Sequence, residues 1–534
     1  MPASANKIQP SSDNSEQDEW RSKPPTSALL ERRAREHFEA MLAWAQRDPG
    51  KRTFHDVEQA LLPLIFALGR YLLALFLCRR HEDLAVPSEW RMGGRRFRRK
   101  RAQGRELGTF FGKVRYWRTY MYAKGGGAYP LDRALKIPAE GFSLGLTSLM
   151  TRLATKVSYA QTTLLLRCFL GWSPSTTSLE RAVLGLGKRT AAWFEAAPLP
   201  VGDGDVLVIM IDSKATPTAT DHELKKRRGK RRKARAPSPR HRARLKRKRR
   251  GPKKRKKKGC HSKNGRAATL IVMYTLKTTR GSKGELIRKG PINRWVYASY
   301  AKKKHAFAVA RREADRRGFQ QGSGKLVQIV IDGELWLERY AKEYFAEARL
   351  TLDVIHALEY LWKAGRSFFR EGSKALEEWV GEQKARLYEG KIKRVVRELK
   401  KALEQIPKTG PGNKGKRERL AKALRYLSKR VEMMNYKELL KQDLEISSGP
   451  VEGAIRYVIA QRFDASGMRW IRERSEALLQ LRCIEINGHW DMFLRFVEAQ
   501  ATGPPGEEWR PLRLQAPTPG PLPTLGLEAE TLAA

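Results

Sequence analysis

Three carboxylates, far apart along the chain, stand where apolar segments end or a helix begins. Asp212 ends the run VLVIMID, Asp332 ends the run LVQIVID, and Glu452 lies in the first turn of the helix predicted after SSGP. Buried strands deliver such side chains to the edge of an open α/β sheet, where ligands bind. Because clustered carboxylates are costly to bury unless cations neutralise them, the pattern predicts a divalent-metal site.

The donor set points to a hard cation. Carboxylate oxygens as the only ligands favour Mg²⁺ or Mn²⁺ over Zn²⁺. Two such ions about 3.5–4 Å apart support in-line phosphoryl transfer, because they activate the attacking oxygen and stabilise the leaving one. The expected cofactor is therefore Mg²⁺ or Mn²⁺, as a pair of ions.

Each acid taken singly also fits a structural role. Asp212 can cap the following turn, Asp332 with Gly333 is a common turn pair, and Glu452 favours a helix N-terminus. Structural ion pairs and caps are frequent enough to make this the simpler interpretation of any one acid. The joint placement of all three favours the metal site.

The assignment of the individual ligands leaves alternatives open. Asp353 also ends a strand-like run and is an alternative second ligand, and Glu445 is an alternative third one. Asp203 and Asp205 precede the first strand and stay open as well. We prefer Asp332 to Asp353 because its strand is more continuously apolar.

Composition indicates a polyanionic partner. The 534 residues include 107 Lys or Arg and 56 Asp or Glu, a formal charge of +51, which favours nucleic acid. Four cysteines without a C-x-x-C pair exclude a disulfide scaffold and fit a reducing cytoplasm. Residues 1–27 are polar and contain no secretory signal, so we expect a cytoplasmic protein without a membrane partner.

Hydrophobic periodicity predicts an α/β unit with a mixed sheet. Continuous apolar runs at 206–212, 268–276, 326–332 and 349–355 indicate buried strands, and helical patterns at 302–318 and 337–345 lie between them. A helical insertion follows at 370–446, where two long amphipathic runs are split by PKTGPGNKGK. Residues 499–534 are rich in Pro and Ala and are predicted to be a disordered tail.

The region at 28–80 is predicted to be helical. The segment at 60–78 is apolar enough to resemble a membrane span, but Arg70 lies at its centre and Pro63 interrupts its start. A central arginine is costly in a bilayer, at about 2.5–3.5 kcal/mol on insertion scales. We therefore expect a buried helix, or a helix that pairs with a second subunit.

Two further segments carry basic residues in patterns typical of nucleic-acid binding. Residues 91–122 predict a small basic β-hairpin, with Phe110, Val114, Tyr116 and Tyr120 on alternating positions. A solvated hairpin is the equally weighted alternative. Residues 159–189 predict a helix-turn-helix, in which Ser173 caps the second helix and Pro174 opens it. The DNA-contacting residues expected there are Arg181, Lys188 and Arg189.

Residues 225–258 form the most biased segment, with 23 Lys or Arg among 34 positions and no acid. Such a run cannot bury itself and is expected to be disordered in isolation. Because the run stands between two predicted strands, we expect a loop at 222–264 that contacts the phosphates of a nucleic acid. The DNA-contacting residues expected in it are Lys246, Arg247, Lys248, Lys253 and Lys254.

The motifs in this order resemble bacterial insertion-sequence DDE transposases, of the Kra-type group and more distantly the Mutator-like one. The resemblance rests on IDSKATPTAT at Asp212, IDGELW at Asp332, LDVIHALEYLW from Leu352, and SGPVEG followed by R-x4-GMRW. It covers roughly 108–497. Where relatives carry a Cys pair near the basic hairpin, this chain has TYMYAKGGG.

The resemblance implies an RNase H-like catalytic core with an all-helical insertion, in which Asp212, Asp332 and Glu452 bind the metal. Asp353 and His356 match the family's acid-x-x-His element and would support the site or contact DNA, although His356 also fits a core residue at a helix start. Further matches, expected to contact transposon ends or to pack under the helix of Glu452, are Arg462, Met468 and Trp470.

The implied organisation places a disordered segment at 1–27 and a DNA-binding region at 28–200. The core then spans 201–369 and 447–498, on either side of the insertion. The implied activity is Mg²⁺-dependent cleavage and strand transfer of double-stranded DNA, at transposon ends and target, by a homodimer or larger assembly. The alternatives are a non-catalytic basic DNA-binding protein and an RNase H-like structure-specific nuclease.

Overall fold

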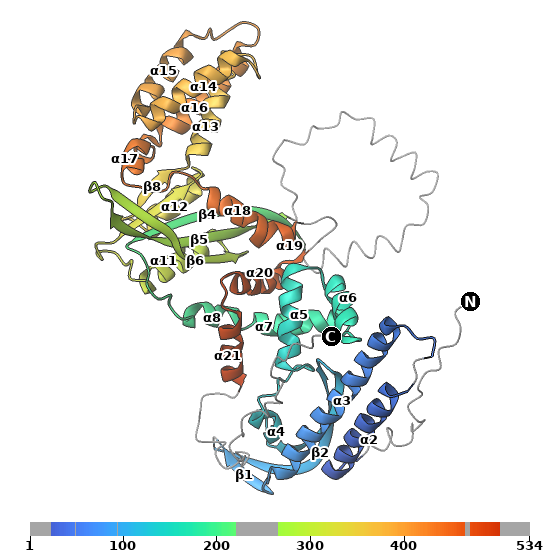
Figure 1. Cartoon of the computed structure of the whole chain (residues 1–534). Coiled ribbons are helices and arrows are strands. Elements are labelled where there is room, and N and C mark those ends of the chain that lie inside the picture. Colours follow the sequence, from blue (N-terminus) through green and yellow to red (C-terminus); the bar gives the residue numbers. More distant parts are fainter. Residues whose placement is uncertain (1–22, 48–49, 93, 220–264, 465–469, 502–534) are drawn as a thin grey trace, which may run out of the picture. The chain divides into compact units, whose positions relative to one another are not determined.

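The computed structural model describes residues 23–47, 50–92, 94–219, 265–464 and 470–501. The chain divides into two compact units, residues 1–189 with 491–534 and residues 190–490. Together they form a mixed α/β protein with a mixed sheet, as predicted (Figure 1). The segments predicted to be disordered lie outside the described residues, apart from 23–27 and 499–501. Residues 499–501 belong to a helix, so the predicted start of the tail is wrong.

The larger unit is built on a sheet with the strand order β6-β5-β4-β7-β8. The central strand β4 runs antiparallel to β5 and parallel to β7, and β7 is parallel to β8. All four predicted strands are present, but the first continues to Ala219, so Asp212 lies within it and not at its end as predicted. The bounds are β4 Val206–Ala219, β5 Gly265–Arg280, β6 Leu286–Ser299, β7 Leu326–Ile331 and β8 Arg349–Leu352.

Burial explains why the central strands read as continuous apolar runs. Residues 206–211 of β4 are all buried, as are 327–331 of β7, because helices cover the sheet. Of these helices, α18 contacts β4 and β5, α11 contacts β5, and α20 contacts β6. Helix bounds in this part are α8 Thr190–Ala196, α11 Lys303–Arg316, α12 Leu335–Tyr344, α18 Gly449–Ala454 and α20 Arg472–Ile486.

A helical bundle separates β8 from α18 in the sequence, as the predicted insertion requires. It extends from the β8 side of the sheet (Figure 1). The first predicted amphipathic run is broken into two helices at Gly390, whose φ of 76° ends the helix. Bounds are α13 Val354–Gly365, α14 Lys374–Tyr388, α15 Ile392–Gln405, α16 Asn413–Ser428, η1 Val431–Met433 and α17 Tyr436–Lys441.

The chain after α18 is irregular. The α-helix passes directly into the π-helix η2, Ile455–Ala460, and then into α19, Gln461–Phe463. The short strand β9, Trp470–Ile471, pairs in parallel with the end of β4 at Thr218 and Ala219. This pairing fastens the segment after the Glu452 helix to the central strand.

The smaller unit contains the predicted hairpin. Strands β2, Arg95–Thr109, and β3, Gly112–Tyr122, pair antiparallel up to Thr109 opposite Gly112, and β1, Glu89–Met92, pairs with β2. Val114 and Tyr116, placed on alternating positions as predicted, point into the core of this unit. Phe110 lies in the turn rather than on a strand, which corrects its predicted position.

The apolar segment lies in α3, Phe54–Asp83, which packs against α2, Ser27–Ala45. The prediction of a buried helix is wrong, since Leu77 is its only buried residue. By length and composition alone, α3 is also the one described helix that could cross a membrane, which is weak evidence by itself. The expectation of pairing with a second subunit stays open.

Three helices follow the hairpin and contact one another: α5 Leu144–Lys156, α6 Tyr159–Leu170 and α7 Thr176–Gly187. Gly171 ends α6 in the left-handed conformation, at φ 69°. The cap of α7 is Ser175, whose hydroxyl accepts from the Ser178 amide. The predicted cap at Ser173 is therefore wrong, and Pro174 precedes the helix. The short α4, Pro130–Ala134, and α21, Trp490–Ala501, complete this unit.

Candidate functional site

Asp212 lies on β4, and Asp332 directly follows the last residue of the neighbouring parallel strand β7. In the register of β4 and β7, Met210 lies opposite Val330, so the two acids, each two residues further on, occupy matching positions. Alternation along the strands points both side chains to the same face. Each carboxylate uses its Oδ1 to accept a backbone N–H, from Ser213 at 2.5 Å and from Glu334 at 2.8 Å respectively.

Burial raises the pKa of both carboxyls above the ordinary value for aspartate. Nearby negative charge raises them further: Glu334 acts on both acids, Glu452 acts on Asp212, and Asp212 acts on Asp332. The carboxylates of the site therefore repel one another, and His356 offsets part of this repulsion for both aspartates. Within the described residues no hydrogen bond reaches the Oδ2 atom of Asp212 or Asp332, which leaves these oxygens for a cation.

Glu452 reaches the site from the first turn of α18. Its Oε1 lies 3.1 Å from the hydroxyl of Ser448, one turn earlier. The same hydroxyl lies 2.8 Å from Oδ2 of Asp353, at the end of β8. The hydroxyl has a single proton, so it donates to one of these two carboxylates at a time and lies between Glu452 and the end of β8.

Asp353 is completely buried and orients His356. Its Oδ2 lies 2.6 Å from Nδ1 of His356, and its Oδ1 accepts from the amides of Ile355 and Ser448. Burial would raise the pKa of Asp353, but the hydrogen bonds from His356 and Ser448 outweigh it and hold that pKa below its usual value. The bond with Asp353 in turn raises the pKa of His356.

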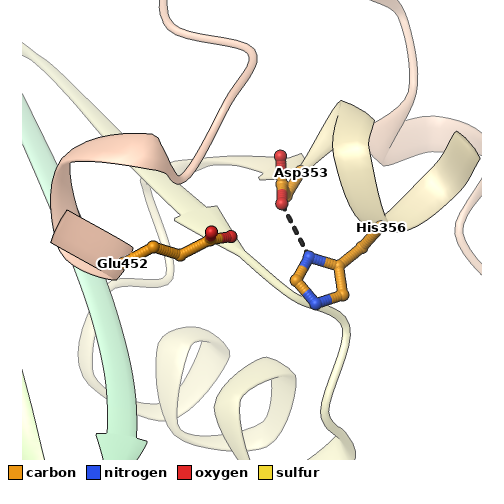
Figure 2. Close-up of side chains that lie close together, drawn as sticks. All are labelled: Asp353, His356 and Glu452. Atoms are coloured by element: carbon orange, nitrogen blue, oxygen red, sulfur yellow. Dashed lines mark hydrogen bonds and ion pairs between the residues drawn. The ribbon is translucent and has the colours of Figure 1, made fainter. Parts of the chain in front are cut away.

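The closest group of metal-ligating atoms is not the predicted triad. Asp353, His356 and Glu452 each offer an atom within 4.8 Å of the other two (Figure 2). Because four donors already occupy Asp353, it suits the role of a positioning residue, whereas His356 keeps Nε2 and Glu452 keeps Oε2 for a ligand. Asp212 and Asp332 supply the further free oxygens described above.

Two side chains at the site escaped sequence reasoning. Glu334 follows Asp332 by two residues, and its Oε2 lies 3.8 Å from Nζ of Lys303. That ammonium also sits 3.3 Å from the ring centre of Trp336. Burial lowers the pKa of Lys303 below its ordinary value. The nearby carboxylates of Glu334, Asp332 and Asp212 oppose this shift but do not cancel it. Glu334 was visible in IDGELW, but nothing in the sequence linked Lys303 to it.

Three of the alternative ligands, Asp203, Asp205 and Glu445, lie away from Asp212. Asp203 and Asp205 precede the first residue of β4, at the end opposite Asp212, where Asp205 accepts from the Thr278 amide. The backbone of Glu445 pairs with the Gln328 side chain. Gln328 aligns with Val208, four residues before Asp212, or roughly 13 Å along the strand. The structure thus separates these three acids from Asp212.

Arg462 and Trp470 pack together beneath the end of β4. The guanidinium carbon of Arg462 lies 4.5 Å from the Trp470 ring centre, and Phe463 contacts the same ring at 4.8 Å. Arg462 is 1% exposed, so of its two expected roles the geometry favours packing. Met468 lies outside the described residues.

The predicted DNA contacts in the smaller unit are exposed. Arg181 lies on α7, and Lys188 and Arg189 follow its end. Two of the hairpin's arginines are committed internally, since Arg105 and Arg118 both bind the buried Asp132. The predicted contacts in the basic tract, Lys246, Arg247, Lys248, Lys253 and Lys254, lie outside the described residues.

Comparison with known proteins adds no family to this picture. No protein-family model matches the chain, and no curated protein matches it either. The argument for function therefore rests on the arrangement of the residues above.

Proposed function

We propose that this protein is a metal-dependent DNA transposase of the DDE type, built on an RNase H-like core. The observation that carries the proposal is the pairing of Asp212 with Asp332 on parallel strands, next to Glu452. These acids come from three segments separated by more than a hundred residues each. Carboxylates that converge from separate segments and repel one another are what a divalent-metal site requires.

The order of the elements supports the same proposal. The strand with the first aspartate is central, the parallel neighbour carries the second, and a helical insertion precedes the helix of Glu452. This is the arrangement implied by the resemblance to insertion-sequence transposases. A mixed sheet alone is compatible with many functions. The placement of the acids on it favours a metal-dependent phosphoryl-transfer enzyme among them.

Asp212, Asp332 and Glu452 would hold the ions. Two bound Mg²⁺ or Mn²⁺ ions supply activation of a water or 3′-hydroxyl and stabilisation of the leaving oxygen. Asp353 orients His356 toward Glu452, and Ser448 fixes the Glu452 carboxylate. Lys303 places a cation beside the acids, where it can contact a DNA phosphate.

The DNA partner follows from charge. Arg181 lies exposed on α7, and Lys188 and Arg189 lie exposed just after its end; we assign them to binding of transposon ends in a helix-turn-helix manner. The basic tract at 225–258 would add sequence-independent phosphate contacts. Handling two ends requires at least a homodimer, and four cysteines without a C-x-x-C pair fit a reducing cytoplasm.

The test is cleavage of the DNA that flanks the coding region, in Mg²⁺, by the full-length protein. The variants D212N, D332N and E452Q should each lose at least about a hundredfold in cleavage rate, while DNA affinity stays within about threefold. D205N, at the other end of the same strand, should cleave like the wild type. Retained cleavage in the three site variants would exclude the proposal, and cleavage without joining to target DNA would indicate a nuclease.

A further inference from the structure

The helical insertion binds the backbone of the turn that carries Asp332. Tyr426, near the end of α16, donates its hydroxyl to the Asp332 carbonyl oxygen at 2.6 Å. Arg430, just after that helix, donates an N–H of its guanidinium to the Gly333 carbonyl oxygen at 2.7 Å. Both carbonyls lie beyond the last residue of β7, so the insertion supplies the partners that strand pairing supplies further back.

The two insertion residues are themselves held in place. The Tyr426 ring stacks on Tyr360 of α13, with ring centres 3.6 Å apart and planes 6° apart, and the Arg430 guanidinium carbon lies 4.2 Å from the Tyr426 ring centre. Arg430 is 4% exposed, and other N–H groups of its guanidinium bind Glu338 on α12 and the Tyr426 carbonyl oxygen. A planar guanidinium that is buried and bonded on several sides fixes the geometry around it.

The fit against the turn is close. A Cβ atom added at Gly333 would lie 2.5 Å from the Tyr426 hydroxyl oxygen and 2.9 Å from Nε of Arg430, so only glycine permits this approach without displacement. A second restraint comes from Asp332 itself, whose Oδ1 accepts the Glu334 N–H at 2.8 Å. Backbone and side chain of Asp332 are therefore both restrained, and its Oδ2 is left in a defined position for a cation.

The neighbouring strand end is held in the same way. Tyr436, the first residue of α17, is completely buried and donates its hydroxyl to the Leu352 carbonyl oxygen at 2.9 Å. Leu352 is the last residue of β8, directly before Asp353. The insertion thus binds the backbone at both strand ends that lead into acids of the site.

We propose that the helical insertion is a positioning part of the metal site, in which Tyr426 and Arg430 hold the Asp332 carboxylate where a divalent ion needs it. This role rests on the proposed function, because it takes Asp332 as a metal ligand. Groups that hold a ligand from behind contribute about ten- to a hundredfold to metal affinity, since a preorganised ligand need not be ordered when the ion binds.

Mn²⁺ binding to full-length, DNA-free protein tests this role, with the EPR signal of free Mn²⁺ as the readout. Y426F removes one hydroxyl and keeps the stacked ring, and it should weaken Mn²⁺ affinity by about tenfold. R430K keeps the charge beside Glu338 but loses the planar fork, and it should weaken affinity in the same direction. Y388F is the matched control and should bind Mn²⁺ like the wild type. Tyr388 lies on α14 of the same insertion, and within the described residues its hydroxyl forms no hydrogen bond.

A metal-free measurement reports the position of the turn directly. In EDTA, hydrogen exchange at the Glu334 amide, which donates to Asp332, should be faster in Y426F than in the wild type. Exchange at this amide should be unchanged in Y388F. Circular dichroism establishes that each variant is folded.

The outcomes separate this role from the proposed function. Wild-type Mn²⁺ affinity in Y426F, or in R430K should Y426F not fold, would overturn the positioning role while weak binding by D332N left the proposed function intact. Equal weakening in Y426F and Y388F would overturn it as well, because the effect would then belong to the insertion in general. If the wild type bound Mn²⁺ no more tightly than D332N, the proposed function would fail, and the positioning role with it.

Discussion

The Nδ1 atom of His356 lies 2.6 Å from the Oδ2 atom of Asp353, in a pair whose carboxylate is fully buried. The same oxygen binds Ser448, and Ser448 binds Glu452. A single carboxylate at the end of β8 thereby sets the position of an imidazole and of a glutamate almost a hundred residues away. The following predictions start from this connection.

Replacing Asp353 with asparagine should destabilise the larger unit by about 2–3 kcal/mol. The amide nitrogen cannot accept, so at least one buried donor among His356, Ser448 and Ile355 loses its partner. Urea unfolding measures the change. S373A, which removes the cap of α14, should cost only about 1 kcal/mol, and equal losses in both variants would contradict the role given to Asp353.

The Asp353–His356 pair should contribute most to the stability of the metal-free protein between about pH 4 and 6.5, the ordinary pKa values of aspartate and histidine. The lowered pKa of Asp353 stabilises the fold above its unfolded pKa, and this contribution is lost as pH falls through the folded value. The raised pKa of His356 stabilises the fold below about 6.5, and this is lost as pH rises through the folded value. H356Q should remove the alkaline decline in urea unfolding with EDTA. An unchanged decline would count against the pair.

D212N and D332N should stabilise the metal-free protein, because each removes one of two mutually repelling carboxylates. Both should lose most of the stabilisation that Mn²⁺ gives the wild type. Thermal unfolding with and without Mn²⁺ provides the comparison. D205N serves as the control, and an equal Mn²⁺ response in all three variants would exclude these acids as ligands.

Gly333 holds the turn after Asp332, and G333A should cost about 2–4 kcal/mol. Its φ is +78°, and an added Cβ would lie 2.5 Å from the Tyr426 hydroxyl oxygen, which itself donates to the Asp332 carbonyl. G322A provides a matched control, since Gly322 has φ +81° and open space around it. G322A should lower the free energy of unfolding through backbone strain alone, by about 1–2 kcal/mol. Equal losses in urea unfolding would show that the clash is absent.

Replacing residues 225–258 with a neutral Gly/Ser segment of equal length should reduce the salt dependence of DNA binding. Each lost phosphate contact lowers the magnitude of the log–log slope by about 0.9. Fluorescence anisotropy across a salt series measures the slope. A slope unchanged from that of the wild type would mean that the tract does not contact phosphates.

The sequence predicted the sheet through its buried strands and missed the strand at its edge. β4, β5 and β7 are continuous apolar runs because both faces are covered. β6 was not predicted, since its first half is polar, contains Pro291, and is mostly exposed up to Arg294. Only the last five residues of β6 are buried. An apolar run of this length is too short to be recognised as a separate strand.

The candidate site was predictable only in part. A carboxylate at the end of an apolar strand is visible in the sequence, and Asp212 and Asp332 were found in this way. The bridge through Ser448 and the ion pair of Lys303 with Glu334 depend on contacts between distant segments, which no local pattern encodes. The burial of α3 was overestimated, because apolar content alone does not tell whether a helix packs within its own chain or against another molecule.

The most direct test of the account replaces Mg²⁺ with Fe²⁺ in the full-length protein and adds ascorbate and peroxide. Hydroxyl radicals formed at a bound ion cut the backbone nearby, and mass spectrometry locates the cuts. The account predicts cuts near Asp212, Asp332 and Glu452 together, suppressed by excess Mg²⁺ and absent in D212N. Cuts confined to segments without these acids, or no cuts at all, would contradict a shared cation site.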